Sequence, residues 1–165
     1  MNKNFIIIIL VLIIVVLGGY LGFVFLKEEK PEKIEEFMTV KVFFGSSQLN
    51  PEVEDCRLVY PVERNILKTQ AVARVALEEL LKGPTSAEKA EDYFTSINSG
   101  VKIQNLTIEN EIARVDFDEQ LEFQVGGSCK VAAIRYQIYQ TLEQFPTIKS
   151  VIISINGRVE DILQP

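Results

Sequence analysis

Hydrophobic residues form one long run near the N-terminus and shorter periodic groups along the rest of the chain. Residues 5–26 contain no charged side chain. At about 1.5 Å per residue, a helix of this length spans roughly 33 Å, enough to cross the hydrocarbon core of a bilayer. The run is long for a cleaved signal peptide, and no A-x-A-like cleavage site follows it. We therefore expect an uncleaved transmembrane signal-anchor helix at residues 5–26, after a short cytoplasmic tail at residues 1–4, with a cleaved signal peptide as the alternative.

The charge pattern changes abruptly after this run. Residues 27–37 are mostly charged and include one proline. A segment of this kind cannot build a hydrophobic core, so we interpret it as a solvated linker. The remaining residues, 38–165, are numerous enough for one two-layer domain with its own core.

Short runs of alternating or β-branched residues predict the strands of this domain. The predicted strands are residues 40–44, 57–60, 102–103 together with 106–108, 112–117 and 149–155. Pro61 is expected to end the second strand, and Asn110 suits a tight turn between the third and the fourth. Asn156-Gly157 is typical of a hairpin turn, so residues 158–162 are expected to return as a partner strand.

Two segments with apolar residues at helical spacing predict the main helices, residues 69–82 and 128–145. Thr69 and Ser128 are placed to cap their N-termini. Residues 85–94 predict a short additional turn of helix. The expected fold is therefore α+β: an antiparallel sheet with two main helices packed on one face, preceded by the N-terminal transmembrane helix.

Charge and composition exclude several classes of function. Residues 34–165 carry 13 Lys and Arg against 20 Asp and Glu, and the chain has no run of basic residues. Nucleic-acid phosphates require clustered Lys and Arg, so a nucleic-acid partner is not expected. The chain has no histidine, which excludes Ser-His-Asp and Cys-His catalysis. No phosphate-binding loop is present, and no cofactor is predicted.

Carboxylates are the only remaining catalytic candidates. Asp116 and Asp118 stand at i and i+2, and Glu119 and Glu122 follow. Two such groups could serve as the acid and base of a glycosidase-type hydrolase. The alternative is a solvent-facing strand end and turn, which is much the commoner outcome for such residues. We therefore expect no catalytic residues and keep a carboxylate-based cell-wall hydrolase as the alternative function.

The remaining candidate residues favour a binding surface. The candidate residues are Arg64, Gly126, Gly127, Ser128 and Arg135. The glycines and the serine precede a predicted helix, whose exposed backbone N–H groups can hold a carboxylate or another anion. The structural alternatives are a cap for the serine, a backbone turn for the glycines and surface salt bridges for the arginines.

Several motifs together resemble a known domain. In chain order they are LVYPVER at residues 58–64, LLKGPT at 80–85, GVKI at 100–103, ARVDF at 113–117, GGS at 126–128, TLEQFP at 141–146 and NG at 156–157. Each is weak alone, but their order and spacing resemble the GerMN domain, first recognised in bacterial sporulation and spore-germination proteins. The resemblance covers residues 38–165.

The resemblance implies an extracytoplasmic module tethered to the membrane, with contacts to a protein or to peptidoglycan in the cell envelope. Such domains are not known as enzymes, and they supply no agreed catalytic residues to carry over. The expected location is therefore the cell membrane, as a single-pass protein with its C-terminal domain outside the cytoplasm. A small-ligand sensor remains a further alternative.

The two cysteines, Cys56 and Cys129, are 73 positions apart. In an external domain such a pair favours one disulfide. Two separate buried thiols or a metal pair remain alternatives, although two cysteines without any histidine form an incomplete zinc site, so no metal is predicted. A disulfide would also support placement outside the reducing cytoplasm.

Overall fold

The computed structural model describes residues 2–25, 35–52 and 55–164. The chain divides into two units, Met1–Ile34 and Glu35–Pro165. Most of the expected linker, residues 27–34, lies outside the described residues.

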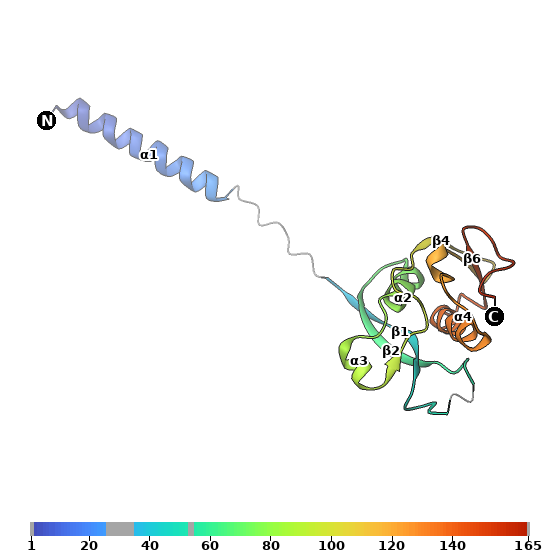
Figure 1. The fold of residues 1–165 in the computed structure, drawn as a ribbon. Coiled ribbons are helices and arrows are strands. Elements are labelled where there is room, and N and C mark those ends of the chain that lie inside the picture. Colours follow the sequence, from blue (N-terminus) through green and yellow to red (C-terminus); the bar gives the residue numbers. More distant parts are fainter. Residues whose placement is uncertain (1, 26–34, 53–54, 165) are drawn as a thin grey trace. The chain divides into compact units, whose positions relative to one another are not determined.

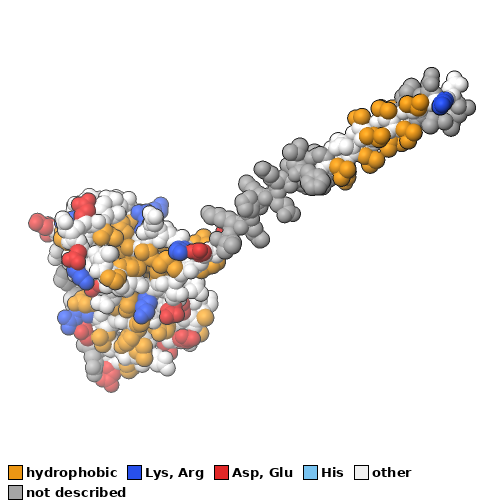
Figure 2. All heavy atoms as spheres, turned by 180° about the vertical axis from the view of Figure 1, so that it is seen from behind, with side chains coloured by type: hydrophobic (Ala, Val, Ile, Leu, Met, Phe, Trp, Pro, Cys, Tyr) orange, Lys and Arg blue, Asp and Glu red, His pale blue; other side chains and the backbone are white. Residues whose placement is uncertain are grey.

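The first unit is the helix α1 (Lys3–Phe25). The long apolar run is therefore helical, and Figure 2 shows hydrophobic side chains along it. Among the described residues, no helix combines the length and the apolarity of a membrane span.

The second unit contains two three-stranded sheets instead of the single sheet that we expected. In the first, β1 (Phe37–Ser46) lies between β2 (Tyr60–Leu67) and β3 (Tyr93–Phe94), and both pairings are antiparallel. The expected strand at residues 57–60 was wrong, because Pro61 lies inside β2, opposite Phe43. The proline is tolerated because β2 is an edge strand of this sheet.

The second sheet has the order β4 (Ile103–Glu109), β5 (Ile112–Phe117) and β6 (Ser150–Ile155). The hairpin of β4 and β5 confirms the prediction, and Asn110 adopts a positive φ of 51° at its turn. However, β6 runs parallel to β5. A helix between two strands of one sheet carries the chain back across it, so the strands point the same way.

The expected return strand at residues 158–162 was also wrong. These residues form no strand, and only an isolated bridge joins Ile155 to Arg158.

The helices of this unit are α2 (Val72–Leu81), α3 (Ser86–Ala90) and α4 (Ser128–Glu143), with a 3₁₀ turn, η1, at Glu119–Leu121. Both main helices are shorter than predicted, α2 mainly at its start and α4 at its end, and neither expected N-terminal cap forms. The Thr69 hydroxyl accepts the N–H of Ala71 at 3.1 Å, which makes a local turn before α2. Ser128 is the first residue of α4 and does not cap it.

The two sheets share one hydrophobic core, because α4 packs against both β1 and β6, and α2 packs against β1 and α4 (Figure 1). Fully buried side chains from every layer meet there, including Phe44, Leu77, Phe117, Ile138 and Ile155. The two main helices thus do not simply cover one face of one sheet, since α4 serves both sheets.

Side chains at the C-terminal end of α4, Thr141 and the C-cap residue Gln144, also complete the edge of β1 that β3 leaves unpaired. The Gln144 amide accepts the Lys41 N–H at 2.8 Å and donates to the Lys41 carbonyl at 2.6 Å. The Thr141 hydroxyl accepts the Phe43 N–H at 3.2 Å. These bonds hold the C-terminal end of α4 against β1.

Candidate functional site

A hollow of about 400 Å³ lies at the N-terminal half of α4, and two of the predicted site residues line it. On the helix side, the lining residues are Gly126, Gly127, Cys129, Lys130, Ala133 and Gln137. We call this cavity the α4 hollow. Its volume lies within the usual range for sites that bind small ligands or short chain segments.

One face of α4 forms the floor of the hollow, because Cys129, Ala133 and Gln137 follow each other at intervals of four residues. Gln137 is fully buried. Its Oε1 accepts the hydroxyl of Thr95 at 2.7 Å. Its Nε2 has no hydrogen-bond partner among the residues that the structure describes.

The helix enters the hollow without a side-chain cap. Gly127 is the N-cap residue, with φ 85° and ψ 130°, a conformation that side-chain-bearing residues rarely adopt. The first backbone bond of the helix runs from the N–H of Val131 to the Gly127 carbonyl at 3.1 Å. The N–H groups of Ser128, Cys129 and Lys130 therefore have no acceptor within α4, and they favour a negative charge at this end.

The opposite wall is apolar and carries the disulfide. Leu58 and Phe94, 46% and 44% exposed, line it. The Phe94 ring lies so close to Gly45 that a Cβ on this glycine would come within 2.5 Å of it. A larger residue at position 45 would push the ring out of place.

Cys56 and Cys129 are joined by a disulfide, with their Cα atoms 5.2 Å apart, as the sequence predicted. The bond links the segment before β2 to the first turn of α4, and both cysteines line the hollow. The predicted disulfide is therefore part of the candidate site.

The charge of the hollow differs from that of the chain. Within the described part of the chain, Lys130 is the only charged residue that lines it, although the chain has a net charge of −6. The neighbouring Asp55 is paired, since Arg57 donates to its carboxylate at 2.9 Å and thereby lowers the pKa of Asp55. The lining is thus apolar with hydrogen-bond donors and one cation. On the face of the unit that Figure 2 shows, by contrast, acidic and basic side chains are interspersed.

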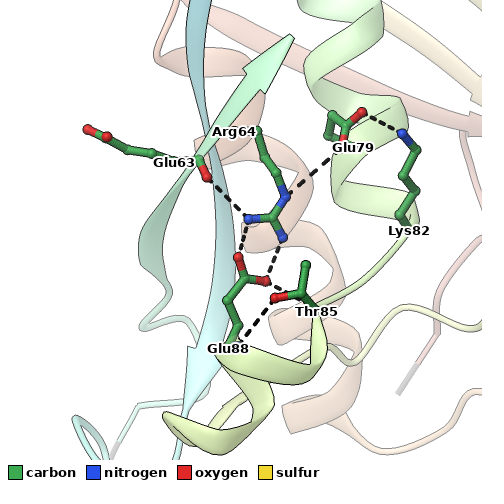
Figure 3. A network of polar contacts seen from close by, with 6 residues as sticks. All are labelled: Glu63, Arg64, Glu79, Lys82, Thr85 and Glu88. Carbon is green, nitrogen blue, oxygen red and sulfur yellow. Dashed lines mark hydrogen bonds and ion pairs between the residues drawn. The ribbon is translucent and has the colours of Figure 1, made fainter.

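Arg64 lies in a different place, in the polar network of Figure 3. Its guanidinium forms a two-pronged ion pair with Glu88, whose Oε2 is 2.6 Å from Nη2, and approaches Glu79 at 4.0 Å. Glu88 also forms a capping box with Thr85 at the start of α3. Arg64 thus joins β2 to α2 and α3.

Two opposing effects act on the carboxyl of Glu88. Its partial burial raises the pKa, whereas hydrogen bonds from Arg64 and from the Thr85 N–H lower it. The hydrogen bonds prevail, so the pKa of Glu88 lies below its ordinary value of 4.5.

The structure does not bring all five predicted binding residues together. Gly126 and Gly127 line the hollow, and Ser128 stands beside them at the start of α4. Arg135 donates to the carbonyl of Ile162 at 3.0 Å, which holds the C-terminal segment. Arg64 and Arg135 do not line the hollow, and binding roles for the five stay predictions.

Three of the four candidate catalytic carboxylates have structural partners; the fourth, Glu119, begins η1 and has none among the described residues. Asp116 accepts the Ser154 hydroxyl at 2.6 Å and the Gly157 N–H at 2.9 Å. Asp118 accepts the Lys102 N–H at 3.0 Å, and Glu122 pairs with Arg158. Within the described part of the chain, no group of three or more His, Cys, Asp or Glu residues is placed to hold a metal ion.

Sequence reasoning missed Lys130, Gln137, Leu58 and Phe94. A signal for Gln137 was present, because it is a polar residue between the apolar positions 134 and 138 of a predicted buried stripe. Its spacing from Cys129 also places both on one helix face. The exposed apolar pair gave no comparable signal, since exposed leucines and phenylalanines are common on protein surfaces.

Comparisons with known proteins agree on the type of domain. Residues 41–161 match the family model Germane, described as sporulation and spore germination. The fold is similar to the first GerMN domain of the sporulation protein GerM from Bacillus subtilis, with a TM-score of 0.54 and 20% identity over 74% of this chain and 85% of that one. The tandem GerMN domains of the same protein give a TM-score of 0.54 and 19% identity over 80% of this chain and 43% of that one. A search of curated proteins found no match.

Proposed function

Because the chain belongs to the Germane family of GerMN domains, we propose that it is a non-enzymatic binding module of the bacterial cell envelope, whose α4 hollow docks a protein partner or a peptidoglycan component. The single observation that carries this proposal is the α4 hollow itself. It combines half-exposed apolar side chains with a helix N-terminus that no side chain caps. Such a combination of apolar walls and a few convergent polar groups is typical of a binding site.

The state of the carboxylates supports the non-enzymatic part of the proposal. A hydrolase of this kind needs two carboxyls that are free to act on a substrate. Asp116 and Asp118 instead accept hydrogen bonds from the backbone N–H groups of Gly157 and Lys102. Both side chains therefore have structural roles: Asp116 holds Ser154 and Gly157, and Asp118 holds the backbone of Lys102.

We further propose that the chain is anchored in the membrane, and this part of the proposal rests on the sequence. Residues 5–26 contain no charge, and some of their side chains lie outside the described residues. The disulfide supports placement of residues 35–165 outside the cytoplasm, because cytosolic thiols are kept reduced. Alkylation of intact cells tests this: a cysteine pair that reacts without prior reduction contradicts the external placement.

The docking role is tested with a photo-crosslinking residue in living cells. One variant carries it at Leu58, in the wall of the hollow, and the control carries it at Leu67, which is 51% exposed at the end of β2 and does not line the hollow. The proposal requires a dominant cross-linked product from position 58 that is absent from position 67. Equal products from both positions, or none from either, overturn it.

A further inference from the structure

We propose that the α4 hollow binds the carboxyl-terminal end of a short peptide with uncharged side chains, with the carboxylate at the N-terminus of α4 and a peptide carbonyl at Gln137. This inference rests on the proposed docking role of the same hollow and names the chemistry of its ligand. Two kinds of molecule carry such a carboxyl-terminal end: a peptidoglycan stem peptide and a protein chain.

The outer part of the hollow selects a negative charge. Three consecutive N–H groups, of residues 128–130, have no acceptor within α4. The ammonium group of Lys130 adds a full positive charge to the same region. Among the residues that the structure describes, no acidic side chain lines the hollow to compete for these donors. A free carboxylate satisfies them, whereas a cationic group would be repelled.

The inner part presents one donor that lacks an acceptor. Gln137 is fully buried, and its Nε2 has no partner among the described residues. An unpaired buried amide is costly, so such a group in a native structure calls for an explanation. The Thr95 hydroxyl accepts the Ile97 N–H and donates to Oε1, so Nε2 is the atom of the amide that has no partner among the described residues. A carbonyl oxygen of a bound chain is the acceptor that would complete it.

The distance between the two ends sets the length of the ligand. Cys129 and Gln137 are eight positions apart on α4, which corresponds to about 12 Å along the helix axis. An extended chain covers about 3.3 Å per residue, so three to four residues reach from one end to the other. A cavity volume of about 400 Å³ requires these residues to be small.

The apolar wall determines which side chains fit between the two ends. Leu58, Phe94 and Ala133 face the ligand with hydrocarbon, and the disulfide adds two sulfur atoms. Small apolar side chains such as alanine gain by burial against this wall. A charged side chain would lose its hydration there without a partner.

The test is a calorimetric titration of the purified full chain with four peptides. Diacetyl-Lys-D-Ala-D-Ala represents the wall stem peptide, and diacetyl-Lys-L-Ala-L-Ala represents a protein C-terminus. The carboxamide form of each serves as a control for the carboxylate. We expect at least one acid to bind and its carboxamide to bind about tenfold or more weakly, since a charge-assisted bond is lost. The diastereomer that binds more tightly identifies the source. If neither acid binds, or if the carboxamide binds equally well, the inference fails.

Matched variants assign the binding to the named groups. Gln137→Leu removes the free donor, whereas Gln140→Leu makes the same change on α4 at a residue that does not line the hollow. We expect about tenfold weaker binding for Gln137→Leu and wild-type affinity for Gln140→Leu. Lys130→Gln is expected to weaken binding of the acid but not of the carboxamide. Equal affinities of the two leucine variants overturn the role of Gln137.

The two proposals fail in different ways. A specific cross-link from position 58 in cells, together with no binding of either peptide acid, rejects the ligand class and keeps the docking role. Absence of a cross-link from position 58 rejects the docking role itself, whatever the peptides do.

Discussion

Removal of the Cys56–Cys129 disulfide should lower the free energy of unfolding by about 4 kcal/mol. The bond closes a loop with a sequence separation of 73 residues. In the chain-entropy model, such a loop reduces the entropy of the unfolded state by about 15 cal/mol/K, which gives roughly 4.4 kcal/mol at 25 °C. Residual structure in the unfolded state makes this figure an upper value.

The variants should still fold, because small domains are typically stable by about 5–15 kcal/mol. We would measure urea unfolding of the purified full chain by circular dichroism for Cys56→Ser, Cys129→Ser and the double variant. With a slope of about 2 kcal/mol per molar urea, the midpoint should fall by about 2 M. The three variants should agree with one another and with the reduced wild type, because each lacks the same single bond.

Two results would refute this reasoning. A loss below about 1 kcal/mol would mean that the unfolded chain is not constrained by the bond as the loop-entropy model requires. A double variant clearly less stable than either single variant would mean that the two sulfur atoms contribute separately, as buried thiols do.

Four further predictions follow from individual contacts. Arg64→Met should cost about 2–3 kcal/mol in thermal or urea unfolding, because it leaves the Glu88 carboxylate partly buried without its ion pair. The pKa of Glu88 is lowered on folding. The stability that this group contributes is therefore present above about pH 4.5 and is lost as the pH falls through its folded-state pKa. Glu88→Gln should flatten this part of the pH–stability curve. Gly127→Ala should cost about 1–3 kcal/mol in urea unfolding, because its φ of 85° is strained for any side chain. Asp116→Asn and Asp118→Asn should leave the position-58 cross-link intact, and a wall-degrading activity that these changes abolish would restore the hydrolase alternative.

The sequence predicted the elements better than their arrangement. Local periodicity indicates which face of an element is buried. It predicted helices at residues 69–82 and 128–145 and a strand at residues 112–117, and these elements are present. The parallel pairing of β5 with β6 depends on where α4 crosses the sheet. A local pattern contains no information on that crossing.

The candidate site could be predicted only in part for the same reason. Gly126, Gly127 and the two cysteines carry local signals, in a turn motif and in a residue type that pairs. Arg64 looked like a surface cation, but β2, α2 and α3 enclose it. Only the tertiary structure brings its acidic partners from two helices to one guanidinium.

The disulfide holds the first turn of α4, whose N–H groups the proposed ligand would need. A helix N-terminus is usually fixed by a side-chain cap, but a cap occupies the N–H groups that a ligand would need. In α4 the N-cap is Gly127, which has no side chain, and the first turn is held by the covalent bond to Cys56 instead. The helix end is thereby fixed while its N–H groups stay available. We therefore predict that reduction of the bond weakens peptide binding while the helix content changes little. A peptide titration and a circular-dichroism spectrum of the reduced protein would measure these two quantities. Equal peptide affinity before and after reduction would mean that the packing of α4 against β1 and β6 alone fixes the hollow.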